Sequence, residues 1–274
     1  MLPMARRRAT GTTVPAGSPP LPAYTDRVVA RLWKVAHRGA SAEVPENTLP
    51  AFERAAEAGA DVIEADVRVT KDGELLILHD ADVDRTTDGH GPLRAMTAAA
   101  ARRLDAGDGR PPPTPAEVLD VARRHGIRVN LDLKETEAVA PATELVRELG
   151  MTGSVSFISF LPDVWEALEA LNPGCPVIHL VDSAAGLASQ VMGDVGTQSR
   201  MAGVGVPAAL VTAALVERMH RHGQGVFAWT VDDDAEMRRL IGIGVNGIVT
   251  NRIEALVEVE RQLRAAAAAP SDGR

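Results

Sequence analysis

Short apolar runs alternate with stretches of helical periodicity from about residue 32 to residue 262. Eight of the apolar runs have the length of a β-strand, and they begin at Trp33, Val62, Arg128, Val155, Pro176, Met201, Val226 and Gly247. Each run is followed by a helical pattern or by a gap long enough for a helix. Strict alternation of strands and helices predicts a parallel sheet with right-handed crossovers.

The number of strand–helix units separates a closed barrel from an open sheet. Eight units predict an α/β fold of the (β/α)8 TIM-barrel class, which typically needs about 250 residues, and the chain has 274. An open dinucleotide-binding sheet would carry a Gly-x-Gly-x-x-Gly motif after its first strand. No such motif follows the first run, so we predict the closed barrel.

One segment after the second strand does not follow the alternation. The turn Lys71-Asp72-Gly73 leads into a further extended run at residues 74–79. The next residues, approximately 81–113, have no place in the series of units. They are predicted to form a small insertion after strand 2, on the face of the barrel where the carboxyl ends of the strands lie.

The two ends of the chain lie outside the predicted barrel. Residues 1–30 are rich in Arg, Pro, Gly and Ala and lack the apolar run of a signal peptide, so we expect a disordered lead-in. Residues 31–264 are expected to form a single domain, and residues 265–274 a flexible tail whose alanines can finish a helix. No stretch approaches the ~20 apolar residues of a membrane span. We therefore expect no stable membrane insertion and a cytoplasmic location.

Composition narrows the classes of partner. The formal net charge of −8 disfavours nucleic acid as a partner on bulk electrostatics. An acidic protein that acts on an anion needs a local positive element, such as a metal ion or a few placed Arg and Lys side chains. The single cysteine, Cys175, excludes an internal disulfide and a cysteine-rich zinc site, and is expected to be a small buried hydrophobic residue.

Acidic side chains gather where two predicted strands end, which is where TIM barrels place their active sites. Glu64 and Asp66 are two residues apart on one strand, so both point to the same face. Two unpaired carboxylates that close resist joint ionisation. A cation that prefers oxygen ligands, Mg2+ or Ca2+, resolves this, and Asp132 on the next strand can complete the site. The alternative is that these acids pair with Arg or Lys on the rim.

Two histidines and two cations are predicted to lie on the same rim. His37 and His79 follow strand ends, and imidazole is the natural general acid or base near neutral pH. Arg38 and Lys134 suit phosphate oxygens, or else pair with the acids. Trp229 is either a wall of the pocket or part of the barrel packing. Together these groups indicate metal-assisted phosphoryl transfer.

Short motifs surround these residues along the chain. They are His37-Arg38-Gly39-Ala40, Pro45-Glu46-Asn47-Thr48-Leu49, Glu64-Ala65-Asp66-Val67, Thr70-Lys71-Asp72-Gly73, His79-Asp80, Asp84-Arg85-Thr86-Thr87, Leu131-Asp132-Leu133-Lys134, Trp229-Thr230-Val231 and Gly244-Val245-Asn246-Gly247-Ile248-Val249-Thr250. From about Val35 to Arg252, the chain thereby resembles the glycerophosphodiester phosphodiesterase family.

The resemblance implies a (β/α)8 barrel with a small insertion, and hydrolysis of glycerophosphodiesters to glycerol 3-phosphate and an alcohol. It implies Mg2+ or Ca2+ held by Glu64, Asp66 and the acid at position 132. It implies His37 and His79 as an acid–base pair, or one of them as the nucleophile in a route through a cyclic phosphate.

The resemblance also assigns the groups that bind the substrate. Arg38 is implied to bind phosphate, and Lys134 to act near the metal and the phosphate. Asn47 belongs to a motif that is implied to lie close to the metal and the phosphate, and Glu46 beside it is a candidate further ligand.

Three features depart from the family pattern. The family usually has Glu where this chain has Asp132, which is shorter by one methylene. It commonly has Asp at the positions of Asn246 and Asn251, which we interpret as structural. The stretch Asp108-Gly109-Arg110-Pro111-Pro112 is shorter than its usual counterpart, so the insertion is trimmed and the alcohol pocket is expected to be open.

Two other functions compete with the glycerophosphodiesterase. A lysophospholipase D-like hydrolase would favour an exposed apolar or basic rim, and the sequence shows no clear one. A catalytically inactive ligand-binding barrel would have lost His37, His79 or the acids, and these are present apart from the change to Asp132. The oligomeric state is left open by the sequence.

Overall fold

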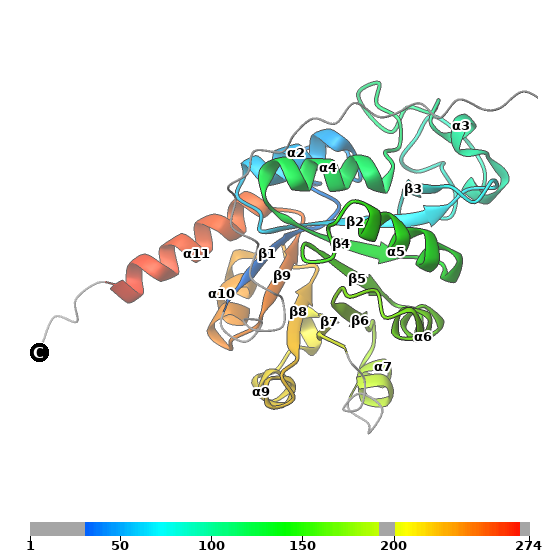
Figure 1. Cartoon of the computed structure of the whole chain (residues 1–274). Coiled ribbons are helices and arrows are strands. Elements are labelled where there is room, and N and C mark those ends of the chain that lie inside the picture. Colours follow the sequence, from blue (N-terminus) through cyan, green and yellow to red (C-terminus); the bar gives the residue numbers. More distant parts are fainter. Residues whose placement is uncertain (1–30, 192–200, 269–274) are drawn as a thin grey trace, which may run out of the picture.

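The computed structural model describes residues 31–191 and 201–268, so the predicted lead-in at residues 1–30 lies outside the described residues. Eight parallel strands close into a barrel because the last strand pairs with the first and the first with the second (Figure 1). The strands are β1 (Trp33–Ala36), β2 (Val62–Val69), β4 (Arg128–Leu133), β5 (Val155–Ser159), β6 (Val177–Leu180), β7 (Gly203–Pro207), β8 (Gly225–Trp229) and β9 (Gly247–Thr250). The predicted (β/α)8 TIM barrel is therefore confirmed.

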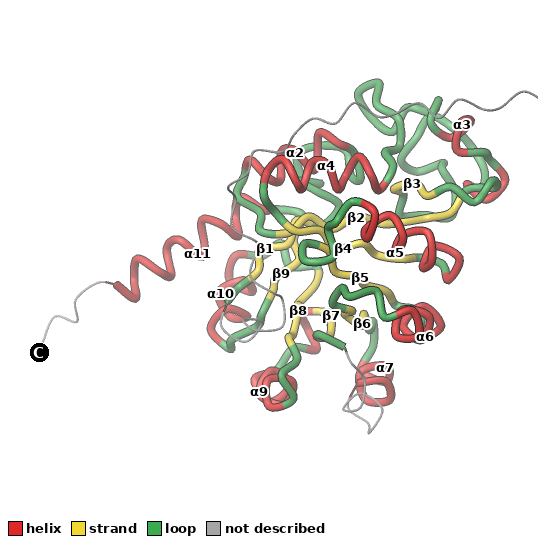
Figure 2. The backbone as a smooth tube through the Cα atoms, viewed as in Figure 1, coloured by secondary structure: helices red, strands yellow, loops and turns green. Residues whose placement is uncertain are grey.

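Helices surround the strands on the outside of the barrel (Figure 2). They are α2 (Leu49–Glu57), α4 (Pro115–His125), α5 (Val139–Glu148), α6 (Pro162–Leu171), α7 (Ala184–Gly186), α9 (Ala213–Arg221), α10 (Asp234–Gly242) and α11 (Ile253–Ala268). None of the helices within residues 31–191 and 201–268 is long and apolar enough to cross a membrane.

Local sequence signals set several helix ends. Thr114 and Glu117 form a reciprocal capping box at the start of α4, and Gly126 ends that helix in the left-handed conformation. Helix α9 begins at Ala213, because the Thr212 side chain accepts a hydrogen bond from the Leu215 amide and so caps the helix. Helix α11 continues to Ala268, beyond the expected domain end at residue 264, since alanines favour helix.

The insertion after the second barrel strand has a small hydrophobic core of its own. Strand β3 (Leu75–Ile77) pairs antiparallel with β2, and the following segment carries η2 (Leu93–Ala95) and α3 (Ala98–Ala101). Leu76, Leu78, Val83, Leu93 and Ala101 are buried together there. This packing carries the residues after β3 along the mouth of the barrel.

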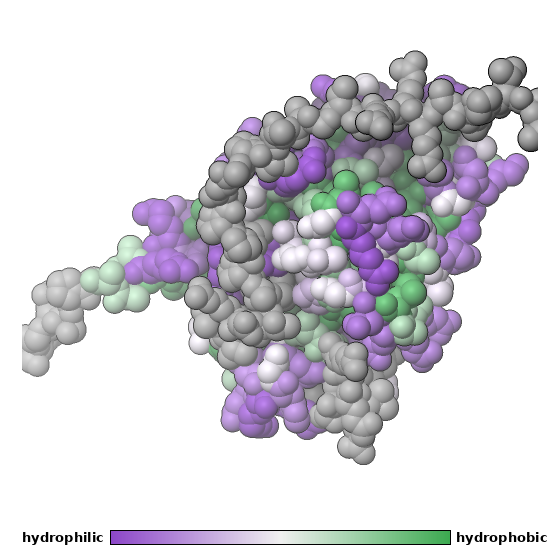
Figure 3. All heavy atoms as spheres, in the orientation of Figure 1, coloured by the Kyte–Doolittle hydropathy of each residue, from purple (hydrophilic) through white to green (hydrophobic). Residues whose placement is uncertain are grey.

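The barrel buries apolar side chains in separate layers. One cluster consists of strand residues only, namely Trp33, Val35, Val62, Ile158, Ile178, Leu180 and Phe227. Two larger clusters contain residues of both strands and surrounding helices. Hydrophilic residues gather around α9 on the outer surface, whereas the middle of the same face is mixed (Figure 3).

Candidate active site

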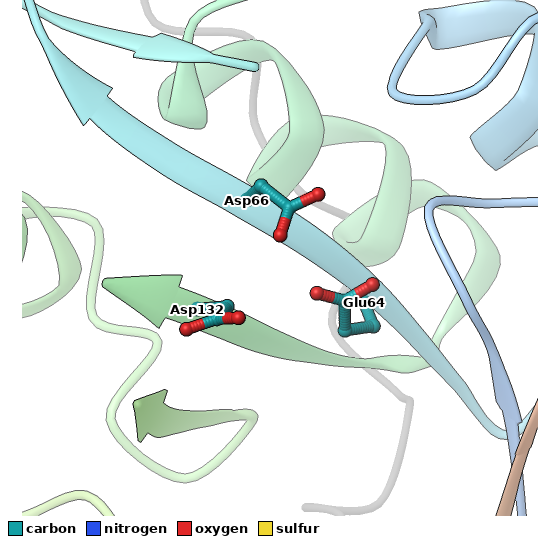
Figure 4. A group of neighbouring side chains, drawn as sticks. All are labelled: Glu64, Asp66 and Asp132. Atoms are coloured by element: carbon teal, nitrogen blue, oxygen red, sulfur yellow. The ribbon is translucent and has the colours of Figure 1, made fainter. Parts of the chain in front are cut away.

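Three carboxylates from two neighbouring strands converge at the mouth of the barrel. Glu64 and Asp66 lie on β2 and Asp132 on β4, where Asp66 is the direct register partner of Asp132. Each offers a carboxylate oxygen, and these oxygens all lie within 4.8 Å of one another (Figure 4). The side chains are buried, with 4%, 1% and 3% of their residue surface exposed. The predicted cluster of acids is thus present, and it could hold a metal ion.

The three acids do not share the same electrostatic environment. Burial raises the pKa of Glu64 well above its usual value, and the charges of Asp66 and Asp132 raise it further. Burial likewise raises the pKa of Asp132. Burial would also raise the pKa of Asp66, but the positive charges of Lys134 and Arg38 outweigh it and hold this pKa at about 2.

Lys134 and Arg38 contact the acids through different carboxylate oxygens. The Lys134 Nζ lies 2.7 Å from Asp66 Oδ1 and also contacts Asp132 Oδ2. The Arg38 Nε lies 3.3 Å from Asp66 Oδ2, and the Arg38 amide donates to Glu64 Oε2 at 2.9 Å. Ion pairing of the acids with rim cations, the alternative to a metal, is therefore part of this arrangement.

The donor set nevertheless fits a divalent cation. Asp132 Oδ1 and Asn130 Oδ1 are buried and have no hydrogen-bond partner among the described residues. A buried oxygen without a donor is costly unless a cation or water satisfies it. Asn130 is the register partner of Glu64, and it was not among the site residues predicted from the sequence. Its place two residues before Asp132, on the same face of the strand, was the available signal.

Asn47 is buried and does not line the cavity. Its Nδ2 donates to Asp66 Oδ2 at 2.7 Å, so it orients an acid. Glu46, the candidate further ligand, accepts hydrogen bonds from Arg38 and Arg85. Both Arg38 and Asn47 have a φ of 57°, a left-handed conformation that is costly outside glycine and often found at functional sites.

The two histidines are each held through Nδ1. His37 Nδ1 lies 2.8 Å from Asn251 Oδ1, and His79 Nδ1 lies 2.6 Å from Asp80 Oδ1. Arg85, from the insertion, donates to Asp80 and contributes to holding the pKa of that carboxyl at about 2. Both histidines line the cavity, so each can offer Nε2 to a substrate. Asn251 was interpreted as structural from the sequence, and this contact shows a closer link to the site.

Burial lowers the pKa of His37, and the neighbouring Arg38 charge lowers it further. The amide of Asn251 and the carboxylates of Asp66 and Glu46 act in the opposite direction without reversing the shift. His37 therefore favours the neutral form, which can accept a proton.

The cavity has an ionisable half and an apolar half. It encloses about 160 Å3. Its ionisable lining comes from β2, β4 and the segments that follow β1, β3 and β4. Its apolar lining comes from the remaining strands or from the residue that follows one of them, and consists of Ile158, Phe160, Ile178, Leu180, Phe227, Trp229 and Val249. Trp229 is both a wall of the cavity and a packing residue, because its ring makes an edge-to-face contact with Phe160 at a centroid distance of 5.4 Å.

Comparisons with known proteins agree with this geometry. A model of the glycerophosphoryl diester phosphodiesterase family matches residues 37–255. The glycerophosphodiester phosphodiesterase of Caldanaerobacter subterraneus subsp. tengcongensis is 33% identical over 248 residues, which cover 83% of this chain and 97% of that protein. The glycerophosphodiester phosphodiesterase of Bacillus subtilis is 30% identical over 258 residues, which cover 84% and 87%.

Solved structures share the fold. An Agrobacterium tumefaciens glycerophosphodiester phosphodiesterase has a TM-score of 0.74 and 28% identity, covering 83% of this chain and 99% of that one. An Oleispira antarctica phosphodiesterase in complex with the product sn-glycerol-3-phosphate has a TM-score of 0.76 and 24% identity, covering 86% and 99%.

Proposed function

The chain belongs to the glycerophosphoryl diester phosphodiesterase family and is an enzyme of that type, and on this premise we propose its reaction and mechanism. We propose that it hydrolyses glycerophosphodiesters to glycerol 3-phosphate and an alcohol with the help of Mg2+ or Ca2+. The observation that carries the proposal is the cluster of three buried carboxylates beside two cavity-lining histidines.

Glu64, Asp66 and Asp132 would hold the cation, and the buried oxygen of Asn130 is a further candidate ligand. A divalent cation, when bound, neutralises phosphate oxygens and polarises the phosphorus–oxygen bonds. Arg38 and Lys134 supply positive charge next to the same acids, where the phosphate of a substrate would lie.

His37 and His79 would move the protons. One accepts the proton of the attacking hydroxyl group, either of water or, in a route through a cyclic phosphate, of the glycerol itself. The other donates a proton to the oxygen of the departing alcohol as its bond to phosphorus breaks. Both rings are held through Nδ1, which leaves Nε2 for this transfer.

The apolar half of the cavity supports two candidates for the organic part of the substrate. It suits a small glycerophosphodiester, and it also supports a lysophospholipase D-like activity, because Phe160 lines the cavity and the next residue, Leu161, is 40% exposed. An inactive ligand-binding barrel has less support, because His37, His79 and the acids all face one cavity. The cytoplasmic location and a small molecule, not nucleic acid, as the partner stay predictions from the sequence.

The decisive experiment measures glycerol 3-phosphate released from glycerophosphocholine and glycerophosphoethanolamine, with and without EDTA. A lysophosphatidylcholine assay runs beside it to distinguish the second candidate. EDTA and the His37→Ala substitution should each abolish release. Activity that survives both would refute the mechanism, and metal-dependent binding without turnover would favour the inactive barrel.

A further inference from the structure

The side chain that holds His37 is itself held in one orientation. Asn251 Oδ1 lies 2.8 Å from His37 Nδ1, and Asn251 Nδ2 donates to Asp232 Oδ2 at 2.7 Å. The Asn251 backbone amide and the Thr250 hydroxyl both donate to Asp232 Oδ1, each at 2.8 Å. Asp232 thus accepts three hydrogen bonds from two consecutive residues at the end of β9.

The backbone fixes the distance between the two chain segments. The His37 amide donates to the Thr250 carbonyl at 2.9 Å, and the Ala42 amide to the Asn251 carbonyl at 3.2 Å. The first bond continues the parallel pairing of β1 with β9 beyond the strand ends, and the second connects the turn after β1 to Asn251. His37 and Asn251 are therefore held together by the barrel itself, independently of their side chains.

The chemistry of the three groups determines where the imidazole proton lies. An ionised carboxylate only accepts hydrogen bonds, so the amide nitrogen of Asn251 must face Asp232 and the amide oxygen must face His37. An amide oxygen also only accepts, so His37 Nδ1 must carry a hydrogen. The neutral ring then has its lone pair on Nε2, the nitrogen left for the substrate.

We propose that Asn251, oriented by Asp232, is a positioning residue that fixes the Nδ1–H tautomer of His37 and directs Nε2 into the cavity. The inference rests on the proposed role of His37 in proton transfer. Three charged groups act on His37 electrostatically, namely Arg38, Asp66 and Glu46. Each of them belongs to the ion-pair network of the acids, so Asn251 is the neutral partner that decides the tautomer.

The hydrogen-bonded arrangement of Asp232, Asn251 and His37, called the clamp below, also explains why an amide fits position 251 here. A carboxylate in its place would put an oxygen 2.7 Å from an oxygen of Asp232, with no hydrogen between them. Exchanging the two residues would restore the missing donor. This makes the pair testable by a double variant.

The test compares Asn251→Leu, Asn251→Asp and the exchange variant Asp232→Asn/Asn251→Asp, with Thr250→Val as the control. Thr250→Val removes a hydrogen bond to Asp232 but none to His37. We expect Asn251→Leu and Asn251→Asp to lower kcat by about 10–100-fold with little change in KM, as for other residues that orient catalytic groups. The exchange variant should recover most of the loss, and Thr250→Val should lose less activity than Asn251→Leu, because the Asn251 amide still contacts His37 and Asp232.

Two readouts separate positioning from mere folding. Nitrogen-15 NMR of the histidines should show Nδ1–H for His37 in the wild type and lose that preference in Asn251→Leu. The acidic limb of the kcat/KM profile should move to higher pH in the exchange variant, because a carboxylate then faces the imidazole.

The outcomes distinguish this inference from the proposed function. An active His37→Ala variant would overturn the role of His37 and with it the proposed function. The inference alone would be overturned if His37→Ala is inactive but Asn251→Leu keeps the wild-type kcat and the Nδ1–H signal of His37. The proposed function would then stand without a positioning role for Asn251. If Asn251→Leu does not fold, the exchange variant decides: no recovery over a folded Asn251→Asp variant refutes the clamp.

Discussion

Lys134 is the main positive charge that compensates the buried acids, so its neutralisation gives the sharpest test of their electrostatics. Its ammonium contacts Asp66 and Asp132, its side chain is only 12% exposed, and the two acids are almost fully buried. These contacts raise the pKa of Lys134 above its usual range, although burial alone would lower it. We expect Lys134→Met to lower stability strongly in the absence of a divalent cation.

The magnitude follows from the burial of the partners. Removing one member of a buried ion pair leaves an uncompensated charge and costs about 3–5 kcal/mol. For a domain of this size each kcal/mol shifts the melting temperature by about 2–4 °C, so the expected loss in EDTA is roughly 6–20 °C. A divalent cation at a concentration of about 100 times its dissociation constant should restore about 2.7 kcal/mol of the free energy of unfolding, because its charge compensates the acids in place of Lys134.

Lys34 offers a matched control. Its side chain is also 12% exposed and contacts two acids, Asp61 and Glu260, but it lies outside the cavity. Lys34→Met should lose less stability, because Arg31 and Arg264 still pair with those acids, and the loss should not respond to metal. Thermal unfolding in EDTA, Mg2+ and Ca2+ measures both variants. Metal that stabilises Lys134→Met no more than Lys34→Met would refute the reasoning.

Three further predictions concern the ligands, the pH dependence and the backbone. Asp132→Glu should keep or raise metal-activated turnover. Asp132→Ala should lower it by more than about 100-fold, because the loss of a residue that only orients a metal ligand already lowers activity by about 10–100-fold. An active alanine variant would show that residue 132 does not belong to the metal site. The midpoint of the acidic limb of the wild-type pH profile of kcat/KM should lie below pH 6.5. Burial and the Arg38 charge lower the pKa of His37, so its imidazole stays neutral down to a lower pH. A midpoint above pH 6.5 would contradict this assignment. Gly39→Ala should cost about 2–5 kcal/mol in denaturant unfolding, against about 1–2 kcal/mol for Gly73→Ala. Both glycines have φ near +80°, but only at Gly39 would a Cβ meet the backbone of α2, at 2.6 Å; equal losses would exclude that clash.

The sequence predicted those parts of the site that depend on one strand and its ends. Side chains two residues apart on a strand point to the same face, which places Glu64 and Asp66 together. The alternation of strands and helices predicts a parallel sheet, in which the strand that carries Asp132 lies next to theirs. The capping box and the terminal glycine of α4 are equally local, so the bounds of that helix are predictable from residues 114–126 alone.

The partners of the two histidines could not be predicted in the same way. His37 and Asn251 are separated by 214 residues, and they meet only because barrel closure places the first strand beside the last. Arg85 reaches Asp80 and Glu46 only because the insertion folds over the mouth on its own small core. No local pattern encodes these approaches, since they depend on how the whole chain packs.

The composition of the site and its arrangement therefore have different origins. The order of polar residues at strand ends, read along the sequence, determined which groups are available: three acids, two histidines and two cations. Tertiary structure decided which oxygens of the acids the cations contact, which oxygens stay without a donor, and which nitrogen of His37 carries its hydrogen. The physical reason is that pKa values and hydrogen bonds depend on burial and on distances of a few ångströms, and the closed barrel sets both.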